Sequence, residues 1–159
     1  MQVIYPAIKA SDPNAQVLLG GLLLDCDPNN PPENPPGSGT FKNCLPAKFT
    51  EGVLVSGGGN AFDGVIFHGY DYYQGELGKY GNSNWHSTWD QTGPVGVIKA
   101  KFLRDLLNQY GYPEKYLINT ETSIICGRTG QEPACQDTVF METKALYVVQ
   151  TYVSAIADT

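Results

Sequence analysis

The sequence predicts an α/β fold in which helices alternate with the strands of a parallel sheet. The strand segments read as short apolar runs, which is typical of central parallel strands covered on both faces. Connections from helix to strand are short, whereas the segments that follow the strands are long. This asymmetry is typical of a site built at the carboxyl ends of parallel strands. An open doubly wound sheet and part of a (β/α)₈ barrel both fit this order.

The first half of the chain is expected to hold a helix, a strand, a long loop and a second helix. Residues 3–10 read as the end of a helix, which stops before Pro13 because proline lacks an N–H group. The apolar run 16–23 predicts a buried strand. Five prolines make residues 25–44 a loop, and a second helix is expected from Pro46 to about residue 56.

The second half is expected to continue with two strands and two helices. Residues 62–68 predict a buried strand, and the aromatic-rich segment 69–93 predicts a loop. A helix with apolar residues at 3.6-residue spacing begins at Pro94, and residues 115–120 predict a third strand. The last helix presents one apolar face, formed by Ala145, Val149, Tyr152 and Ile156.

Composition and charge restrict the classes of partner. The 159 residues are expected to form a single domain, residues 1–159. Sixteen acidic against ten basic residues give a net charge of −6, which disfavours binding to a phosphate backbone, so we expect no nucleic-acid partner. No apolar run approaches the roughly 20 residues that span a bilayer, and the N-terminus does not read as a signal peptide. We therefore expect no membrane partner.

The four cysteines predict disulfides rather than a metal site. No C-x-x-C or C-x-x-H spacing is present, and no other motif indicates a metal ion or a cofactor. Three pairings are possible, and proximity favours Cys26 with Cys44 and Cys126 with Cys135. Four free thiols in a cytosolic protein are the alternative. Disulfides indicate an oxidising compartment, so we expect a secreted or extracellular protein.

Glu121 is the main candidate for chemistry. It directly follows the third predicted strand, where a carboxylate can act as a nucleophile or base; a carboxylate that only caps the sheet edge is the alternative. Strand alternation predicts that Asn119 points to the same side as Glu121 and Thr120 to the other. His68 and Tyr70 end the preceding strand and are expected to orient a neighbouring carboxylate.

An aromatic and polar cluster follows the second strand and predicts carbohydrate binding. Sugar rings have apolar faces that stack on aromatic side chains and hydroxyl rims that need polar partners. Packing of the long loop is the alternative explanation. The residues expected to contact substrate, together with Asn119, are Asp71, Tyr72, Tyr73 and Trp85.

Three segments in register resemble the second half of a clan A glycoside hydrolase (β/α)₈ barrel, close to the family 39 β-xylosidase-like and cellulase-like enzymes. Residues 7–17, AIKASDPNAQV, resemble the passage from the fourth helix into the fifth strand. Residues 62–70, FDGVIFHGY, resemble the sixth strand, which typically ends in His-x-Tyr. Residues 116–121, YLINTE, resemble the seventh strand, which ends in the catalytic nucleophile.

The resemblance implies a retaining enzyme that acts on β-linked glycosides or polysaccharides. Glu121 would be the nucleophile, with His68 and Tyr70 beside it and Tyr70 hydrogen-bonded to its carboxylate. The acid/base glutamate of this family lies at the end of the fourth strand, which would fall upstream of Met1. Since retaining catalysis needs both carboxyl groups, this chain alone is expected to be inactive unless Asp71 or Glu76 substitutes.

Two further readings remain open at this point. One is a non-catalytic carbohydrate-binding or degenerate barrel protein, and the other is an unrelated open α/β domain with a structural Glu121. A partial barrel also leaves sheet edges without partners, so self-association through these edges is expected.

Overall fold

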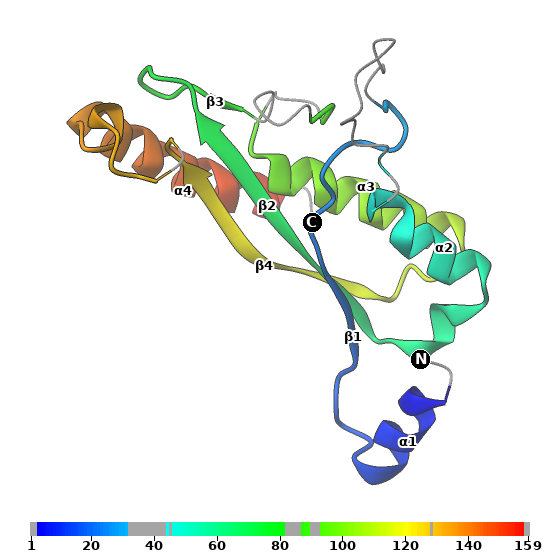
Figure 1. Cartoon of the computed structure of the whole chain (residues 1–159). Coiled ribbons are helices and arrows are strands. Elements are labelled where there is room, and N and C mark those ends of the chain that lie inside the picture. The colour runs from blue at the N-terminus through cyan, green and yellow to red at the C-terminus, as the bar shows by residue number, and fades with distance from the viewer. Residues whose placement is uncertain are drawn as a thin grey trace.

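The computed structural model describes residues 3–31, 44, 46–81, 87–89, 93–127 and 129–157, and it shows an open parallel sheet flanked by helices. Strand β2 (Gly64–Tyr73) is central and runs parallel to β1 (Leu18–Leu22) on one side and β4 (Tyr116–Ile125) on the other (Figure 1). The two-residue strand β3 (Tyr80–Gly81) pairs antiparallel with the end of β2. The α/β class with a parallel sheet is confirmed; closure into part of a barrel remains a prediction.

The helices leave one face of the sheet open. Helices α2 (Phe49–Val55), α3 (Val95–Gln109) and α4 (Thr138–Ala157) lie on one side of the strands, whereas α1 (Ile4–Ser11) lies beyond their N-terminal ends (Figure 1). The described residues also form the 3₁₀ turns η1 (Pro46–Lys48), η2 (Gly58–Ala61) and η4 (Pro133–Cys135).

The core lies between the sheet and α3. Val65 and Phe67 of β2 are 0% and 2% exposed, because alternate residues of a strand point to the same face. They belong to one apolar cluster with Leu19 of β1 and with Leu103 and Leu107 of α3. This cluster buries one face of the sheet and leaves the other face available for a site.

Both longer strands extend beyond their expected ends. The expected strand ends were residues 68 and 120, but β2 continues to Tyr73 and β4 to Ile125. The two strands pair from Gly64 with Tyr116 to Tyr72 with Ile125. Residues 69–73 were therefore assigned wrongly to a loop, because their polar and aromatic side chains do not form the apolar run used to recognise a strand.

Helix α4 packs in an orientation that its sequence does not indicate. Its buried residues are Phe140, Thr143 and Tyr147, which lie on the helix face that meets the sheet. The apolar face expected from the sequence is instead exposed, with Val149 at 60% and Tyr152 at 69%. Apolar periodicity identified the stripe correctly but not the surface against which the helix packs.

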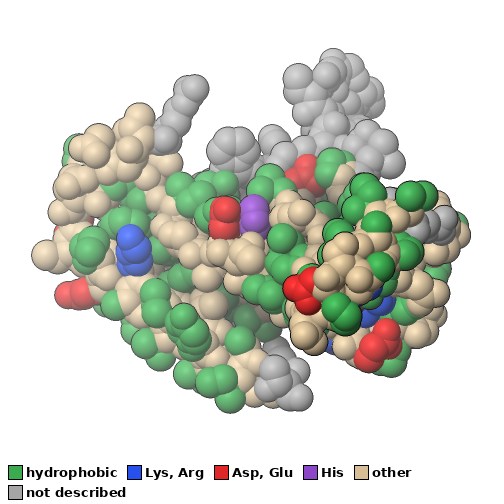
Figure 2. Space-filling view, turned by 90° about the horizontal axis from the view of Figure 1, so that it is seen from below, with side chains coloured by type: hydrophobic (Ala, Val, Ile, Leu, Met, Phe, Trp, Pro, Cys, Tyr) green, Lys and Arg blue, Asp and Glu red, His purple; other side chains and the backbone are tan. Residues whose placement is uncertain are grey.

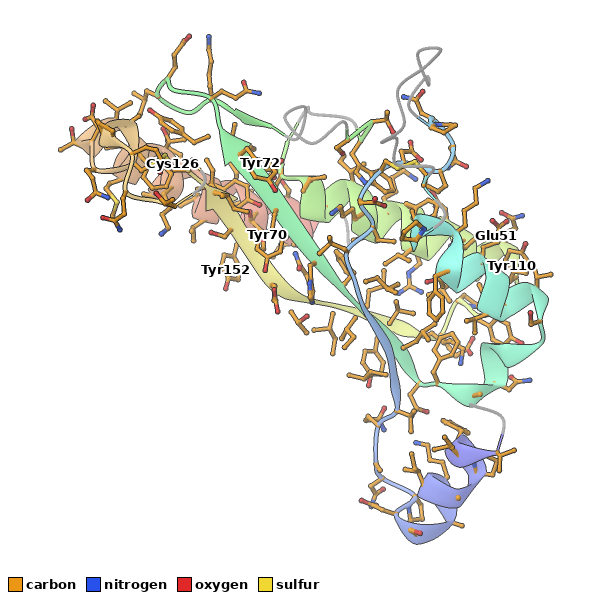
Figure 3. The ribbon with its side chains drawn as sticks, viewed as in Figure 1. Glu51, Tyr70, Tyr72, Tyr110, Cys126 and Tyr152 are labelled. Carbon is orange, nitrogen blue, oxygen red and sulfur yellow. A yellow bond between two sulfur atoms is a disulfide. The ribbon has the colours of Figure 1, made fainter. Side chains whose placement is uncertain are left out.

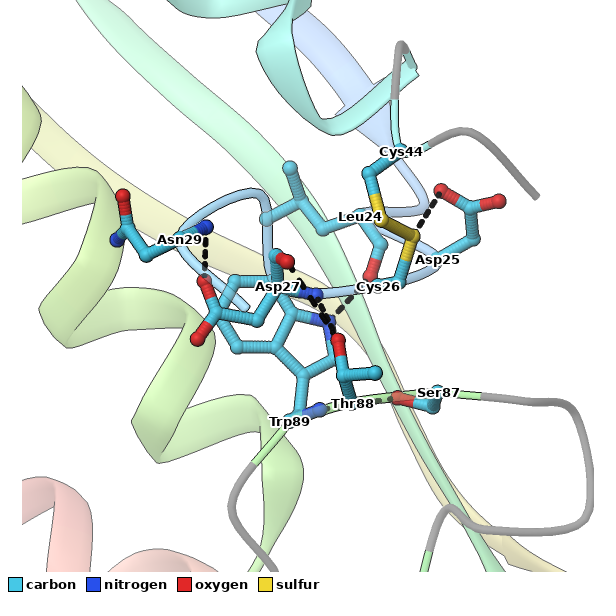
Figure 4. The surroundings of a disulfide bond; sticks show 9 residues. All are labelled: Leu24, Asp25, Cys26, Asp27, Asn29, Cys44, Ser87, Thr88 and Trp89. Carbon is cyan, nitrogen blue, oxygen red and sulfur yellow. Dashed lines mark hydrogen bonds between the residues drawn. A yellow bond between two sulfur atoms is a disulfide. The ribbon is translucent and has the colours of Figure 1, made fainter. Parts of the chain in front are cut away.

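Two disulfides form, and they are the pairs expected from the sequence. Cys26 bonds to Cys44 and Cys126 to Cys135, each with a Cα–Cα distance of 5.5 Å. Beside the first disulfide, the Trp89 indole N–H donates to the backbone oxygen of Leu24 at 2.8 Å (Figure 4). Two disulfides are compatible with a secreted protein. Within the described part of the chain, no helix combines the length and apolarity needed to cross a membrane.

Asp63, just before β2, connects α1 to the sheet. Its carboxylate accepts hydrogen bonds from the Tyr5 hydroxyl at 2.7 Å and the Val17 N–H at 2.7 Å, and it pairs with the Lys9 ammonium at 2.9 Å. One carboxylate thus anchors a helix that contributes no buried residue to the core.

Candidate functional site

The open face of β2 carries the candidate site residues His68, Tyr70 and Tyr72. The intervening residues Gly69 and Asp71 point toward the helices, as alternation along a strand requires. Asp71 is 1% exposed, whereas the three open-face residues remain partly accessible. Figure 3 shows Tyr70 and Tyr72 following one another along β2.

Glu121 of β4 lies beside His68 and Tyr70, as the sequence predicted. The Tyr70 hydroxyl donates a hydrogen bond to Glu121 Oε2, and His68 Nδ1 lies 3.6 Å from the same oxygen. The Glu121 side chain is 53% exposed and that of His68 is 19% exposed. In Figure 2 an acidic side chain lies directly against the histidine at the surface. One carboxylate oxygen is therefore held by its neighbours while the group stays accessible from solvent.

The contact with Glu121 also changes the chemistry of Tyr70. The hydrogen bond to the Glu121 carboxylate raises the pKa of the Tyr70 phenol, and burial adds to the shift. Tyr70 therefore remains a proton donor to the carboxylate over the physiological range. The His68 and Tyr70 rings meet edge to face, with centroids 6.3 Å apart, so each ring limits the movement of the other.

Gly21 of β1 provides space for the His68 ring, and sequence analysis did not identify it. A Cβ atom added at Gly21 would lie 2.6 Å from His68 Nε2, which is too close for two heavy atoms. The sequence contains only a Gly-Gly pair in a strand at this point, which is a general sign of an irregular strand or a close approach.

Asn119 does not lie on the open face, contrary to the expectation from strand alternation. Phe67 pairs with Asn119 and His68 pairs with Glu121, so Thr120 is an extra residue in β4. This β-bulge reverses the alternation, and Asn119 faces the helices. Its carboxamide lies close to the backbone at Gly96 of α3. Asn119 was therefore assigned wrongly to the substrate-binding group.

Asp71 and Tyr73 also lie on the helix side of β2. The Asp71 carboxylate accepts a hydrogen bond from the Val95 N–H at 2.8 Å, at the start of α3. Burial raises the pKa of Asp71, partly offset by its hydrogen bonds and by nearby Lys99. The Tyr73 ring packs against Phe140 of α4, with centroids 5.2 Å apart. Both residues support the packing of the helices, so their expected role in substrate contact is corrected.

Further aromatic residues of the segment 69–93 divide between the open face and the core. Tyr72 lies on the open face, one position beyond Tyr70 on that side. Trp85 lies outside the described residues. Trp89 is 3% exposed and packs edge-on against Phe102 of α3, so it belongs to the core. Of these aromatic residues, Tyr72 is the one that the structure places next to the Glu121 group.

Lys99 of α3 supports the site from the helix side, and sequence analysis also missed it. Its ammonium donates to the backbone oxygens of Leu23 at 2.7 Å and His68 at 3.1 Å, which joins the end of β1 to β2. Lys99 is 4% exposed. Lys99 lies four residues after Val95, on the apolar face of the predicted helix. A lysine at such a position indicates a buried ammonium with a hydrogen-bond partner.

The candidate site does not coincide with the cavity found beside α3. A cavity of about 410 Å³ lies beside α3, and its lining includes Asp27, Trp89 and Phe102 but not Glu121 or His68. Among the residues that the structure describes, no group of three or more His, Cys, Asp or Glu side chains could hold a metal ion. The functional groups that the structure brings together on the open face are the Glu121 carboxylate, the Tyr70 phenol and the His68 imidazole.

No family model, curated protein or solved structure matches the chain.

Proposed function

We propose that the open face carries the nucleophile side of a retaining β-glycosidase site. The observation that supports this most is the accessible Glu121 carboxylate, held on one oxygen by the Tyr70 hydroxyl with His68 beside it. A nucleophilic carboxylate must stay ionised and fixed while its reacting oxygen reaches the anomeric carbon. The hydrogen bond from the Tyr70 hydroxyl restricts the movement of the Glu121 side chain.

In the proposed first step, an oxygen of Glu121 forms a bond to the anomeric carbon. The bond from that carbon to the glycosidic oxygen breaks, and the leaving group takes the electron pair. A proton from a second carboxyl group normally assists this departure, with the two groups about 5–5.5 Å apart in retaining enzymes. Asp71 lies on the helix side, and Glu76 pairs with Lys79 at 2.6 Å in the turn after β2. The proposal therefore assigns the acid/base to a carboxyl group other than those of Asp71 and Glu76.

A substrate with an activated leaving group tests the nucleophile without the acid/base. Dinitrophenolate departs without protonation, and a fluorine beside the anomeric carbon slows breakdown of the glycosyl-enzyme. We expect dinitrophenyl deoxyfluoro-β-xyloside or β-glucoside to add one sugar unit to the chain, located at Glu121 by peptide mass spectrometry.

The controls use matched carboxylates. Glu121→Gln is expected to abolish the label, while Glu114→Gln, at an exposed carboxylate just before β4, keeps it. An unlabelled wild-type chain, or a label at another residue, contradicts the proposal. Oligosaccharide binding without any label, weakened by Tyr72→Ala, favours the non-catalytic carbohydrate-binding protein instead.

A further inference from the structure

The position of Glu121 on the open face depends on one extra residue in β4. Register positions from Gly64–Tyr116 to Phe67–Asn119 are regular, and the next pair is His68 with Glu121. Thr120 therefore has no partner in β2. Since successive residues of a strand point to opposite faces, the extra residue reverses the facing of every position after it.

Without the bulge, the pairing would direct Glu121 into the helix layer. Thr120 would then pair with His68, and Glu121 with Gly69. That side of the sheet is now taken by Thr122, which pairs with Gly69 and whose hydroxyl lies 3.1 Å from the Tyr147 hydroxyl of α4. A carboxylate there would point toward α4 and away from the Tyr70 hydroxyl.

The Asn119 side chain bridges the two strands at the bulge. With its amide nitrogen turned toward the backbone, it donates to the Phe67 oxygen at 3.2 Å and to the Glu121 oxygen at 2.8 Å. A bulge interrupts the ladder of hydrogen bonds, so carbonyl groups beside it need other donors. One carboxamide supplies both, because its two N–H groups diverge.

We propose that Asn119 is a positioning residue, which clamps the bulge at Thr120 and so holds Glu121 on the open face beside His68 and Tyr70. Asn119 acts from the helix side and does not touch substrate. The consequence for catalysis rests on the proposed function, whereas the arrangement itself is tested without any sugar.

The test measures the Tyr70 phenol, whose raised pKa has its hydrogen bond to Glu121 as the largest cause. Fluorotyrosine is incorporated into the full chain, and the fluorine NMR signal of residue 70 is identified by its loss in Tyr70→Phe. The phenol of fluorotyrosine titrates at lower pH than that of tyrosine, which brings the titration into a measurable range. Glu121→Gln gives the reference value without the carboxylate. We expect Asn119→Ala and Asn119→Asp to lower the pKa of Tyr70 by at least half of the difference between wild type and Glu121→Gln.

Two further variants separate positioning from general loss of stability. Leu117→Ala removes core packing from the same strand and is expected to lower the unfolding temperature while leaving the pKa of Tyr70 unchanged. Deleting Thr120 removes the extra residue and lets Glu121 follow Asn119 directly and pair with His68 in regular register, so in that background Asn119→Ala is expected to leave the pKa of Tyr70 unchanged; if the deletion variant does not fold, the Asn119 variants decide. If the pKa of Tyr70 in both Asn119 variants equals that of the wild type, the proposal is overturned.

The sugar-labelling experiment has an independent outcome. If the wild-type chain takes up no sugar label but Asn119→Ala still lowers the pKa of Tyr70, the glycosidase proposal is contradicted and the positioning role is supported. Labelling that is unaffected by Asn119→Ala contradicts the positioning role alone.

Discussion

Gly21 and His68 share a space on the open face that holds one side chain, not two. A methyl group at Gly21 would lie 2.6 Å from His68 Nε2. We expect Gly21→Ala to displace the imidazole from Glu121 while lowering the free energy of unfolding by no more than about 1 kcal/mol, because the ring is the movable end of a side chain. Nitrogen-resolved NMR of the His68 ring measures the displacement.

Gly52→Ala is the matched control for this prediction. Gly52 lies in α2, and a Cβ atom there meets no atom within 4 Å. The substitution is expected to leave the His68 signals unchanged and to raise stability by about 0.5–1 kcal/mol, since alanine is the better helix former. His68 signals that are identical in Gly21→Ala and wild type would contradict the steric argument.

Asp63 makes the stability of the molecule depend on pH. Burial opposes its ionisation, but hydrogen bonds from the Val17 N–H, Lys9 and Tyr5 outweigh that effect and lower the pKa of the carboxyl from 3.8 to about 2. A lowered pKa contributes stability above pH 3.8 that is lost as the pH falls through about 2. Asp63→Asn is expected to cost about 1 kcal/mol at pH 7, because the Lys9 pair is partly exposed.

The measurement is urea unfolding of wild type and Asp63→Asn between pH 7 and pH 2. The difference between the two proteins should shrink below about pH 4. Asp105→Asn, which removes an exposed pair with Lys101 on α3, serves as the control and should change stability by less than about 0.5 kcal/mol at every pH. A pH-independent cost of Asp63→Asn would contradict the prediction.

At the scale of elements, the second disulfide fixes the segment between β4 and α4. Cys126 and Cys135 are 8% and 6% exposed and belong to one cluster with Ile124, Phe140 and Tyr147. Replacing both cysteines by alanine is expected to lower the free energy of unfolding by about 2–3 kcal/mol, as closure of a loop of this size predicts. Calorimetry of the double variant tests this, and a loss below about 1 kcal/mol would show that the cluster, not the bond, fixes the segment.

The sequence predicts where the helices and strands lie better than it predicts which side chains point to each face of the sheet. Apolar runs located the centres of β1, β2 and β4, and Cys spacing gave both disulfides. The position of Glu121 next to His68 and Tyr70 came from the resemblance of their strand-end motifs. These features depend on local composition or on neighbours in the chain.

The side of the sheet to which a side chain points depends on how the strands pair, and the sequence of one strand does not determine this pairing. Simple alternation placed Asn119 with Glu121, but the bulge at Thr120 separates them. Alternation also explains Asp71, which lies between two open-face tyrosines and is buried behind them. Asp71 was misplaced because residues 69–73 were predicted to form a loop, where no alternation is expected.

At the scale of the whole molecule, the sheet ends on both sides without a partner in the described part of the chain. β1 pairs with β2 on one side, and β4 pairs with β2 on the other. Because all three strands are parallel, the free edge of β4 in one copy can pair with β1 of a second copy and continue the sheet. Unpaired edges are sites of association between chains.

Helix α4 adds apolar surface that favours the same association. Its exposed apolar residues include Val149 at 60% and Val153 at 60%, and large exposed apolar patches mark sites of association. We expect the chain to self-associate with increasing concentration, measured by analytical ultracentrifugation.

Val149→Lys with Val153→Lys should shift association to at least tenfold higher concentration. The matched pair Phe49→Lys with Val55→Lys, on exposed positions of α2, should leave it unchanged. A wild-type chain that remains monomeric across the whole range would show that neither the edges nor α4 bind a second copy.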